Sequence, residues 1–149
     1  MTADALATTR GQRLMRQALA HVTAVQAYDQ QRGADKQLAR AYGGWCHRIP
    51  ILVLTNGLCQ TVAFLEDKAS GQESPGGYQK EACRLVRAHL AQVLGIDHAD
   101  RLAQKVSEAP LPAYMHQTRL ILNAWVYYKR FAVSLLGVEV GDVDTEGSA

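Results

Sequence analysis

The chain has 149 residues and 48% hydrophobic residues, a composition typical of one water-soluble globular domain. This length is sufficient for a hydrophobic core without disulfides or metal, and it leaves little room for a second full domain. The net charge of +2 hides an asymmetry, because residues 139–149 carry four acidic residues and no basic ones. Residues 1–138 therefore hold 16 basic against 10 acidic residues, a net charge of +6.

The first half of the chain predicts two helices separated by a glycine. Residues 3–31 are rich in Ala, Gln, Leu and Arg, with apolar residues at helical spacing, and Gly33 interrupts this pattern. Strong helix formers resume over residues 34–46, until Gly43 and Gly44 weaken the pattern. We expect a long first helix and a short second one.

Residues 49–69 allow two interpretations, a helix or a hairpin. Two apolar runs flank Asn56-Gly57, a sequence typical of a two-residue hairpin turn. However, Pro50 suits a first helical turn, and the apolar residues share one helical face: Ile51, Leu54, Leu58, Val62 and Leu65. A lone hairpin without further strands is marginal, so helix is the favoured prediction.

The second half predicts three more helices after a Gly-, Pro- and Ser-rich loop at residues 70–77. A helix over residues 78–94 ends at Gly95, and a short one runs from an Asp97 N-cap to residue 108. The last covers residues 112–136. The predicted fold is all-α: a single compact helical bundle of about six helices over residues 1–138, followed by an acidic, disordered tail at 139–149.

The cysteines, the N-terminus and the longest uncharged run indicate a cytoplasmic protein. Cys46, Cys59 and Cys83 show no C-x-x-C spacing, which argues against disulfides and structural zinc. The N-terminus lacks the pattern of a secretory signal. The uncharged run 49–65 contains proline and several polar residues, so we expect a core segment and no membrane association.

No pattern of catalytic or metal-binding residues stands out. The sequence contains no G-x-S-x-G elbow, and its five histidines are scattered singly without metal-ligand spacing. The neighbours Cys46 and His47 are better explained as core or capping residues than as a catalytic pair. We expect a protein that is not an enzyme and needs no cofactor or metal.

The basic residues are more informative, because three groups recur at helical spacing. They are Arg10, Arg13 and Arg16; Arg32, Lys36 and Arg40; and Lys80, Arg84 and Arg87. Like charges at these spacings repel, which suggests an anionic partner such as a phosphate backbone. A solvated face balanced by acids such as Asp29, Asp35 and Glu81 is the alternative.

The last helix carries aromatic and basic residues that suit base stacking. Trp125 and Tyr128, however, follow the inward helical period with Ile121 and Ala132, which favours a core role. Lys129 and Arg130 then project from the flanks as secondary candidates for RNA contact.

Several segments together resemble the small-subunit family of the type III-B CRISPR effector, the Cmr complex. The resemblance spans about residues 20–137. It rests on a proline and an N-G-L-x-Q-T-x-A-F run, on Tyr114 and Trp125 in the last helix, and on the Lys129-Arg130 pair. Its mainly structural positions are Pro50, Asn56, Gly57, Leu58, Gln60, Phe64, Tyr114 and Trp125.

The resemblance implies a non-catalytic subunit of an RNA-guided, RNA-targeting complex in antiviral defence. Its implied partners are the backbone subunit, the large polymerase-like subunit, further copies of itself, guide RNA and target RNA. The candidate RNA-binding residues are Arg13, Arg16, Lys36, Arg40, Lys80, Arg84, Arg87, Lys129 and Arg130. A pure assembly subunit without RNA contact is the main alternative, and a small helical enzyme is a third.

Overall fold

The computed structural model describes residues 7–73 and 77–140, and this part of the chain contains no strand. The all-α prediction is therefore confirmed, while most of the predicted acidic tail lies outside the described residues. The helices are α2 (Arg10–Arg32), α3 (Gln37–Asn56), α4 (Leu58–Ser70), α5 (Gln79–Val93), α6 (Leu102–Glu108) and α7 (Leu111–Ser134), with a 3₁₀ turn, η1, at Ala99–Arg101.

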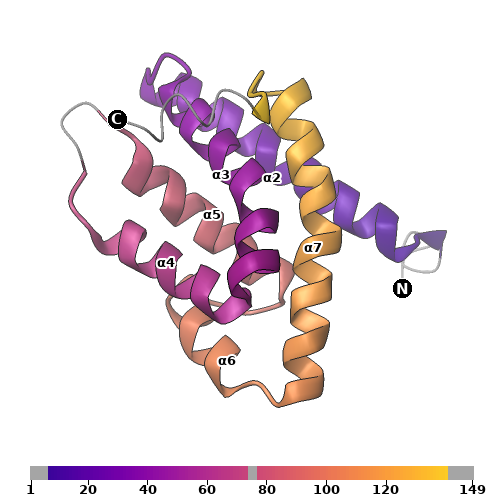
Figure 1. Ribbon diagram of the computed structural model, residues 1–149. Helices are drawn as coiled ribbons and strands as arrows, with labels where there is room; N and C mark the ends of the chain where they lie inside the picture. Colours follow the sequence, from indigo (N-terminus) through magenta and orange to yellow (C-terminus); the bar gives the residue numbers. More distant parts are fainter. Residues whose placement is uncertain (1–6, 74–76, 141–149) are drawn as a thin grey trace.

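The helices pack around α3, which lies between α7 on one side and α4 and α5 on the other (Figure 1). Helix α2 crosses α7, and its N-terminal turns extend beyond α7 (Figure 1). Helix α6 contacts α4 at the end of the molecule where α7 begins. The N-terminal turns of α2, which we call the projecting arm, carry Arg13 and Arg16 on their exposed side.

Helix α2 is bounded by two local signals. At its start, the Thr9 hydroxyl accepts a hydrogen bond from the Gln12 amide, and the Gln12 side chain accepts one from the Thr9 amide. This capping box satisfies two amides that otherwise lack helical partners. At its end, Gly33 adopts a left-handed conformation with φ of 65°. The predicted break at Gly33 is confirmed.

The prediction that a helix begins at Pro50 is wrong. Helix α3 continues through Pro50, flanked by the buried Ile49 and Val53, and ends only at Gly57. Gly57 has φ of 87° and ψ of 164°, a conformation that strains any residue with a side chain. Burial on both sides of the proline thus outweighs the hydrogen bond that it removes.

The helix boundary at Gly57 also corrects the prediction that the apolar residues of this segment share one buried helical face. Leu58, Val62 and Leu65 are buried, but Ile51 and Leu54 are 58% and 72% exposed. They lie on α3, whose axis and register differ from those of α4. The predicted Asp97 N-cap is wrong as well. The residue that precedes the 3₁₀ turn is His98, whose backbone is extended, and no side chain caps the turn.

The core is built around aromatic side chains from α3 and α7. The rings of Trp125 and Tyr128 are fully buried, as their helical period predicts. They stack on each other with centroids 4.1 Å apart. Tyr42 of α3 is also fully buried. Replacing a buried aromatic residue by alanine typically lowers the free energy of unfolding by about 3–5 kcal/mol, so these rings contribute strongly to the stability of the fold.

The end of the described chain is anchored on α3. Val138 is 3% exposed, and its carbonyl accepts a hydrogen bond from His47 Nε2 at 2.8 Å. Its side chain lies so close to Gly43 that a Cβ there would approach Val138 Cγ2 to 2.6 Å. Gly43, predicted to weaken a helix end, instead lies inside α3 and permits this contact.

Candidate nucleic-acid interface

The predicted cationic residues are distributed over α2, α3, α5 and α7. Arg13, Arg16, Arg40, Arg84 and Arg130 are exposed. Lys36, which directly precedes α3, is exposed as well, whereas three others are half-buried: Lys80, Arg87 and Lys129.

Arg87 differs from the other candidates because acidic side chains already bind it. Its guanidinium lies 2.8 Å from a Glu66 carboxylate oxygen and 3.6 Å from one of Asp100. Its side chain is only 17% exposed. Arg87 thereby ties α5 to α4 and to η1, an arrangement that stabilises the fold.

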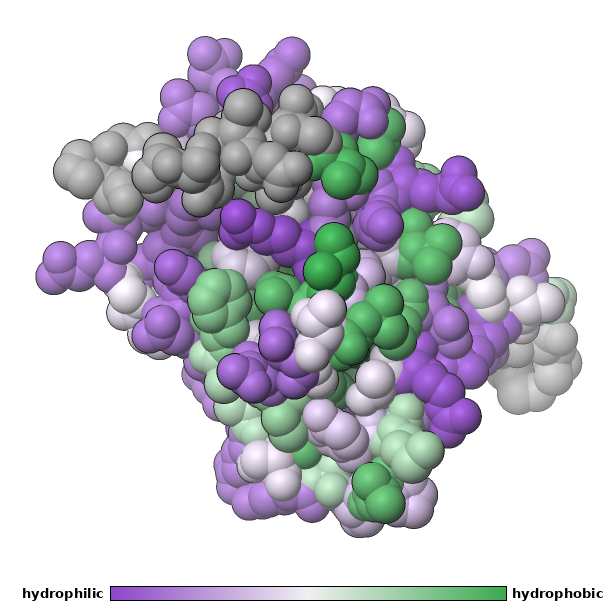
Figure 2. All heavy atoms as spheres, in the orientation of Figure 1, coloured by the Kyte–Doolittle hydropathy of each residue, from purple (hydrophilic) through white to green (hydrophobic). Residues whose placement is uncertain are grey.

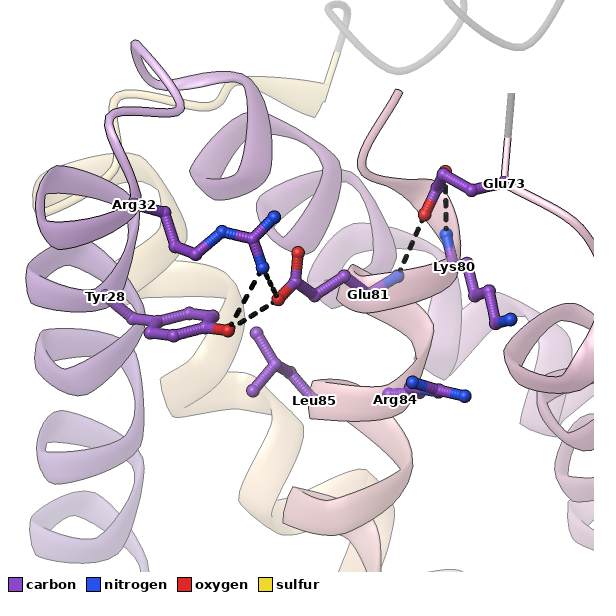
Figure 3. A pocket seen from close by; sticks show the side chains of 7 residues that line it. All are labelled: Tyr28, Arg32, Glu73, Lys80, Glu81, Arg84 and Leu85. Carbon is purple, nitrogen blue, oxygen red and sulfur yellow. Dashed lines mark hydrogen bonds and ion pairs between the residues drawn. The ribbon is translucent and has the colours of Figure 1, made fainter. Parts of the chain in front are cut away.

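Cations from two different sequence groups meet at one pocket between α2 and α5. Arg32 belongs to the second group, and Lys80 and Arg84 to the third. The pocket has a volume of about 530 Å³, within the range of small-ligand sites. Figure 3 shows Tyr28 and Arg32 reaching from α2 toward Glu81 on α5, with Lys80 and Arg84 on the α5 side.

Arg32 is held by both charge and aromatic contacts. Its Nη1 donates to Glu81 Oε1 at 2.6 Å, and the same oxygen accepts a 2.6 Å hydrogen bond from the Tyr28 hydroxyl. The guanidinium also lies 5.9 Å from the Tyr28 ring centroid and 5.8 Å from that of Tyr78. The side chains of Arg32 and Glu81 are 46% and 22% exposed, so the ion pair lies at the surface.

A second carboxylate lines the same pocket. Glu73 accepts hydrogen bonds from the backbone amides of Lys80 at 3.2 Å and Glu81 at 3.3 Å. The pocket therefore contains three cationic and two acidic side chains. The suggestion that acids balance the cationic stripes holds for Glu81, whereas Asp29 has another role.

Asp29 is a buried cap for α3. It is 3% exposed, and its carboxylate oxygens accept hydrogen bonds from the amides of Lys36 at 2.9 Å and Ala39 at 2.8 Å. Asp29 and Lys36 also line a pocket of about 670 Å³ beside the end of α7. Sequence reasoning missed this cap because Asp29 belongs to the preceding helix.

Two motif residues, Gly57 and Tyr114, meet where α3 and α4 pack against α7. The Tyr114 hydroxyl accepts a hydrogen bond from the Cys59 amide at 3.1 Å and would lie 3.5 Å from a Cβ at Gly57. Leu58 is fully buried, whereas Asn56 and Gln60 are exposed. Phe64 is 38% exposed and contacts the ring of Trp45.

Two histidines predicted to be scattered singly instead stack on each other, with His89 buried and His21 half-buried. The rings of His21 on α2 and His89 on α5 are 3.9 Å apart and nearly parallel. His21 donates to Gln92 from Nε2 at 2.6 Å, which leaves Nδ1 to accept from the Tyr128 hydroxyl at 2.5 Å. His89 Nδ1 lies 2.6 Å from the Tyr42 hydroxyl.

Burial disfavours protonation of both imidazoles. It lowers the pKa of His89 to about 3, with a smaller contribution from the neighbouring His21. Burial also lowers the pKa of His21, partly opposed by its hydrogen bond to Gln92. Their 68-residue separation gives no sequence signal for this pair.

Among residues 7–73 and 77–140, no group of three or more His, Cys, Asp or Glu side chains is arranged to hold a metal ion. In the same part of the chain, every helix is too short or too polar to cross a membrane. The structure is that of a small all-α protein with cationic residues on several helix faces.

Comparisons with known proteins identify the family. The model of the CRISPR-associated protein family Cas_Cmr5 matches residues 10–135. A Thermus thermophilus protein, the CRISPR system Cmr subunit Cmr5, is 35% identical over 116 residues, covering 77% of this chain and 93% of that protein. The chain belongs to the Cmr5 family.

The fold is also similar to a solved structure. The crystal structure of a CRISPR-associated Cmr5 family protein from Thermus thermophilus aligns with a TM-score of 0.62 and 32% identity. The alignment covers 86% of this chain and 97% of that one.

Proposed function

We propose that this chain is a non-catalytic subunit of a type III-B CRISPR Cmr effector complex and contacts the RNA backbone through its cationic helix faces. Family membership supports the complex. The observation that carries the RNA contact is that Arg32, Lys80 and Arg84, from distant segments, line one open pocket. Contact with phosphates suits a guide of variable sequence, because base pairing supplies the specificity.

The exposed cations near the start of α2 form a second candidate surface, separate from the pocket. Arg13 and Arg16 lie on the projecting arm of α2, and Arg32 lies at the opposite end of the same helix. The helix is 23 residues long, about 35 Å at 1.5 Å per residue. No Lys or Arg lies between Arg16 and Arg32, and a separation of 16 residues places them on different faces of the helix, so its two ends offer separate phosphate contacts. Each such contact adds salt-dependent binding without sequence preference.

A pure assembly role is the second candidate, and apolar surface favours it. Ile51, Leu54, Leu111 and Met115 are each at least 50% exposed. Figure 2 shows hydrophobic side chains gathered over α3 and along α7 on one face. Exposed apolar groups of this kind mark protein contacts, here with other subunits of the complex or further copies of this chain.

Crosslinking within the assembled complex separates the two roles. We expect guide or target RNA substituted with 4-thiouridine to crosslink to this chain at peptides from α2 or α5. The α6 peptide, with the exposed cation Lys105, provides the internal control and should remain free of RNA. If RNA crosslinks only to other subunits of an intact complex, the chain is an assembly subunit and the proposed RNA contact is wrong.

A further inference from the structure

The pocket between α2 and α5 is lined by both cationic and acidic side chains. Lys80 and Arg84 offer cationic groups to an anion, and Arg84 Nε donates only a long, 3.3 Å hydrogen bond to the Ala69 carbonyl. Arg32, the third cation, is directed at Glu81. An incoming anion therefore meets two available cations, a third whose charge Glu81 already offsets, and the carboxylate of Glu73, which accepts two backbone hydrogen bonds.

We propose that this pocket receives one phosphate of a single-stranded RNA and that Glu81 limits its affinity by competing with the phosphate for Arg32. This inference rests on the proposed function, and it names Glu81 as the residue that regulates the affinity of the chain for RNA. The phosphate is bound by Lys80 and Arg84, and Arg32 joins only when its ion pair with Glu81 is broken.

The surroundings favour a nucleotide over an acidic peptide segment. The rings of Tyr28 and Tyr78 both lie within 6 Å of the Arg32 guanidinium, and Leu85 lines the pocket between the polar groups. Aromatic rings beside cations are typical of surfaces that bind single-stranded nucleic acid, because every base offers a face for stacking. The pocket volume of about 530 Å³ accommodates more than a carboxylate side chain.

The ion pair is suited to regulation because it can be exchanged. Arg32 and Glu81 are both partly exposed, and a surface ion pair is easily replaced by another anion. A phosphate can therefore displace the carboxylate without unfolding either helix. Substituting Glu81→Gln keeps an acceptor for the Tyr28 hydroxyl while removing the competing charge.

Binding of the full chain to a fluorescent oligouridylate, followed by anisotropy across a salt series from about 20 mM, tests this assignment. We expect Glu81→Gln to tighten binding about two- to fivefold with little change in the salt dependence, because Arg32 joins a phosphate that Lys80 and Arg84 already bind. Lys80→Ala with Arg84→Ala should weaken binding and flatten the slope by about 0.7, the value for the single phosphate that the pocket binds. Glu108→Gln, on the exposed end of α6, is the matched control and should leave both the affinity and the slope unchanged.

The outcomes separate this inference from the proposed function. If Glu81→Gln and Glu108→Gln tighten binding equally, or if Lys80→Ala with Arg84→Ala changes nothing while Arg13→Ala with Arg16→Ala weakens binding, the pocket assignment is wrong and RNA contact elsewhere stands. If no variant binds oligouridylate even at the lowest salt, both proposals fail. Tighter binding of an oligoglutamate peptide than of oligouridylate would overturn the assignment to RNA.

Discussion

Reversing the charge of six candidate cations is expected to weaken capture of target RNA by the reconstituted complex on the order of a hundredfold at physiological salt. The variant carries glutamate at Arg13, Arg16, Lys36, Arg40, Lys80 and Arg84, which are the candidates of the three helical groups outside the Arg87 ion pairs. Each cation that is removed takes away a phosphate contact, and each new glutamate adds repulsion. Two guides of unrelated sequence should lose affinity equally, because phosphates carry no sequence information.

A matched control distinguishes this effect from a general change in charge. Arg101→Glu with Lys105→Glu introduces the same kind of reversal at exposed positions of η1 and α6. This pair should leave capture within about twofold, since distant exposed charges are largely screened at physiological salt. Thermal melts and the subunit composition of each complex show whether the variants fold and assemble. Unchanged capture by a correctly assembled six-residue variant would contradict the proposed RNA contact.

Acidification from pH 6.5 to 4.5 is expected to destabilise the chain by about 2–3 kcal/mol through His89 alone. The pKa of His89 is about 3 in the folded chain, against an ordinary value of 6.5. Between these values the unfolded state binds the proton and the folded state does not, so stability falls as pH falls. The stability that comes from burying a neutral His89 is fully present above pH 6.5. Chemical denaturation across this range measures it.

The variant His89→Asn isolates this contribution. Asparagine places an acceptor near the position of Nδ1, facing the Tyr42 hydroxyl, but it does not titrate. We expect lower stability at neutral pH, because the stacking on His21 is removed, and a flatter dependence on pH. The control is His116→Asn, at an exposed position on α7, which should preserve the wild-type slope. An unchanged slope in His89→Asn would show that His89 is not the group responsible.

Local signals in the sequence predicted most of the fold. Gly33, Gly95 and Gly137 each adopt positive φ near the end of a predicted helix, where a glycine is least strained. The inward period of α7 correctly placed Trp125 and Tyr128 in the core. These features depend on neighbours within a few residues, so the sequence alone carries them.

The errors arose where tertiary contacts override local preference. Pro50 is a plausible helix start by propensity, yet the packing of α3 carries the helix through it to Gly57. The capping of α3 by Asp29 likewise depends on how two helices meet. Helical spacing alone does not predict either arrangement.

The same limit applies to the candidate site. The spacing of Lys80, Arg84 and Arg87 predicts one cationic stripe, but Glu66 of α4 and Asp100 of η1 bind its last member. Arg32 and Glu81 are 49 residues apart, so their ion pair has no local signature. The stacked His21 and His89 escaped prediction for the same reason.

The salt dependence of target-RNA binding tests most directly the claim that this chain binds RNA phosphates. The measurement compares complexes reconstituted with and without the chain, the other subunits remaining in place. We predict that omitting the chain lowers affinity and flattens the logarithmic salt dependence by about 0.7 for each phosphate of single-stranded RNA that it binds, equally for unrelated guides. A lower affinity with an unchanged salt slope would contradict phosphate binding and indicate that the chain acts through protein contacts alone.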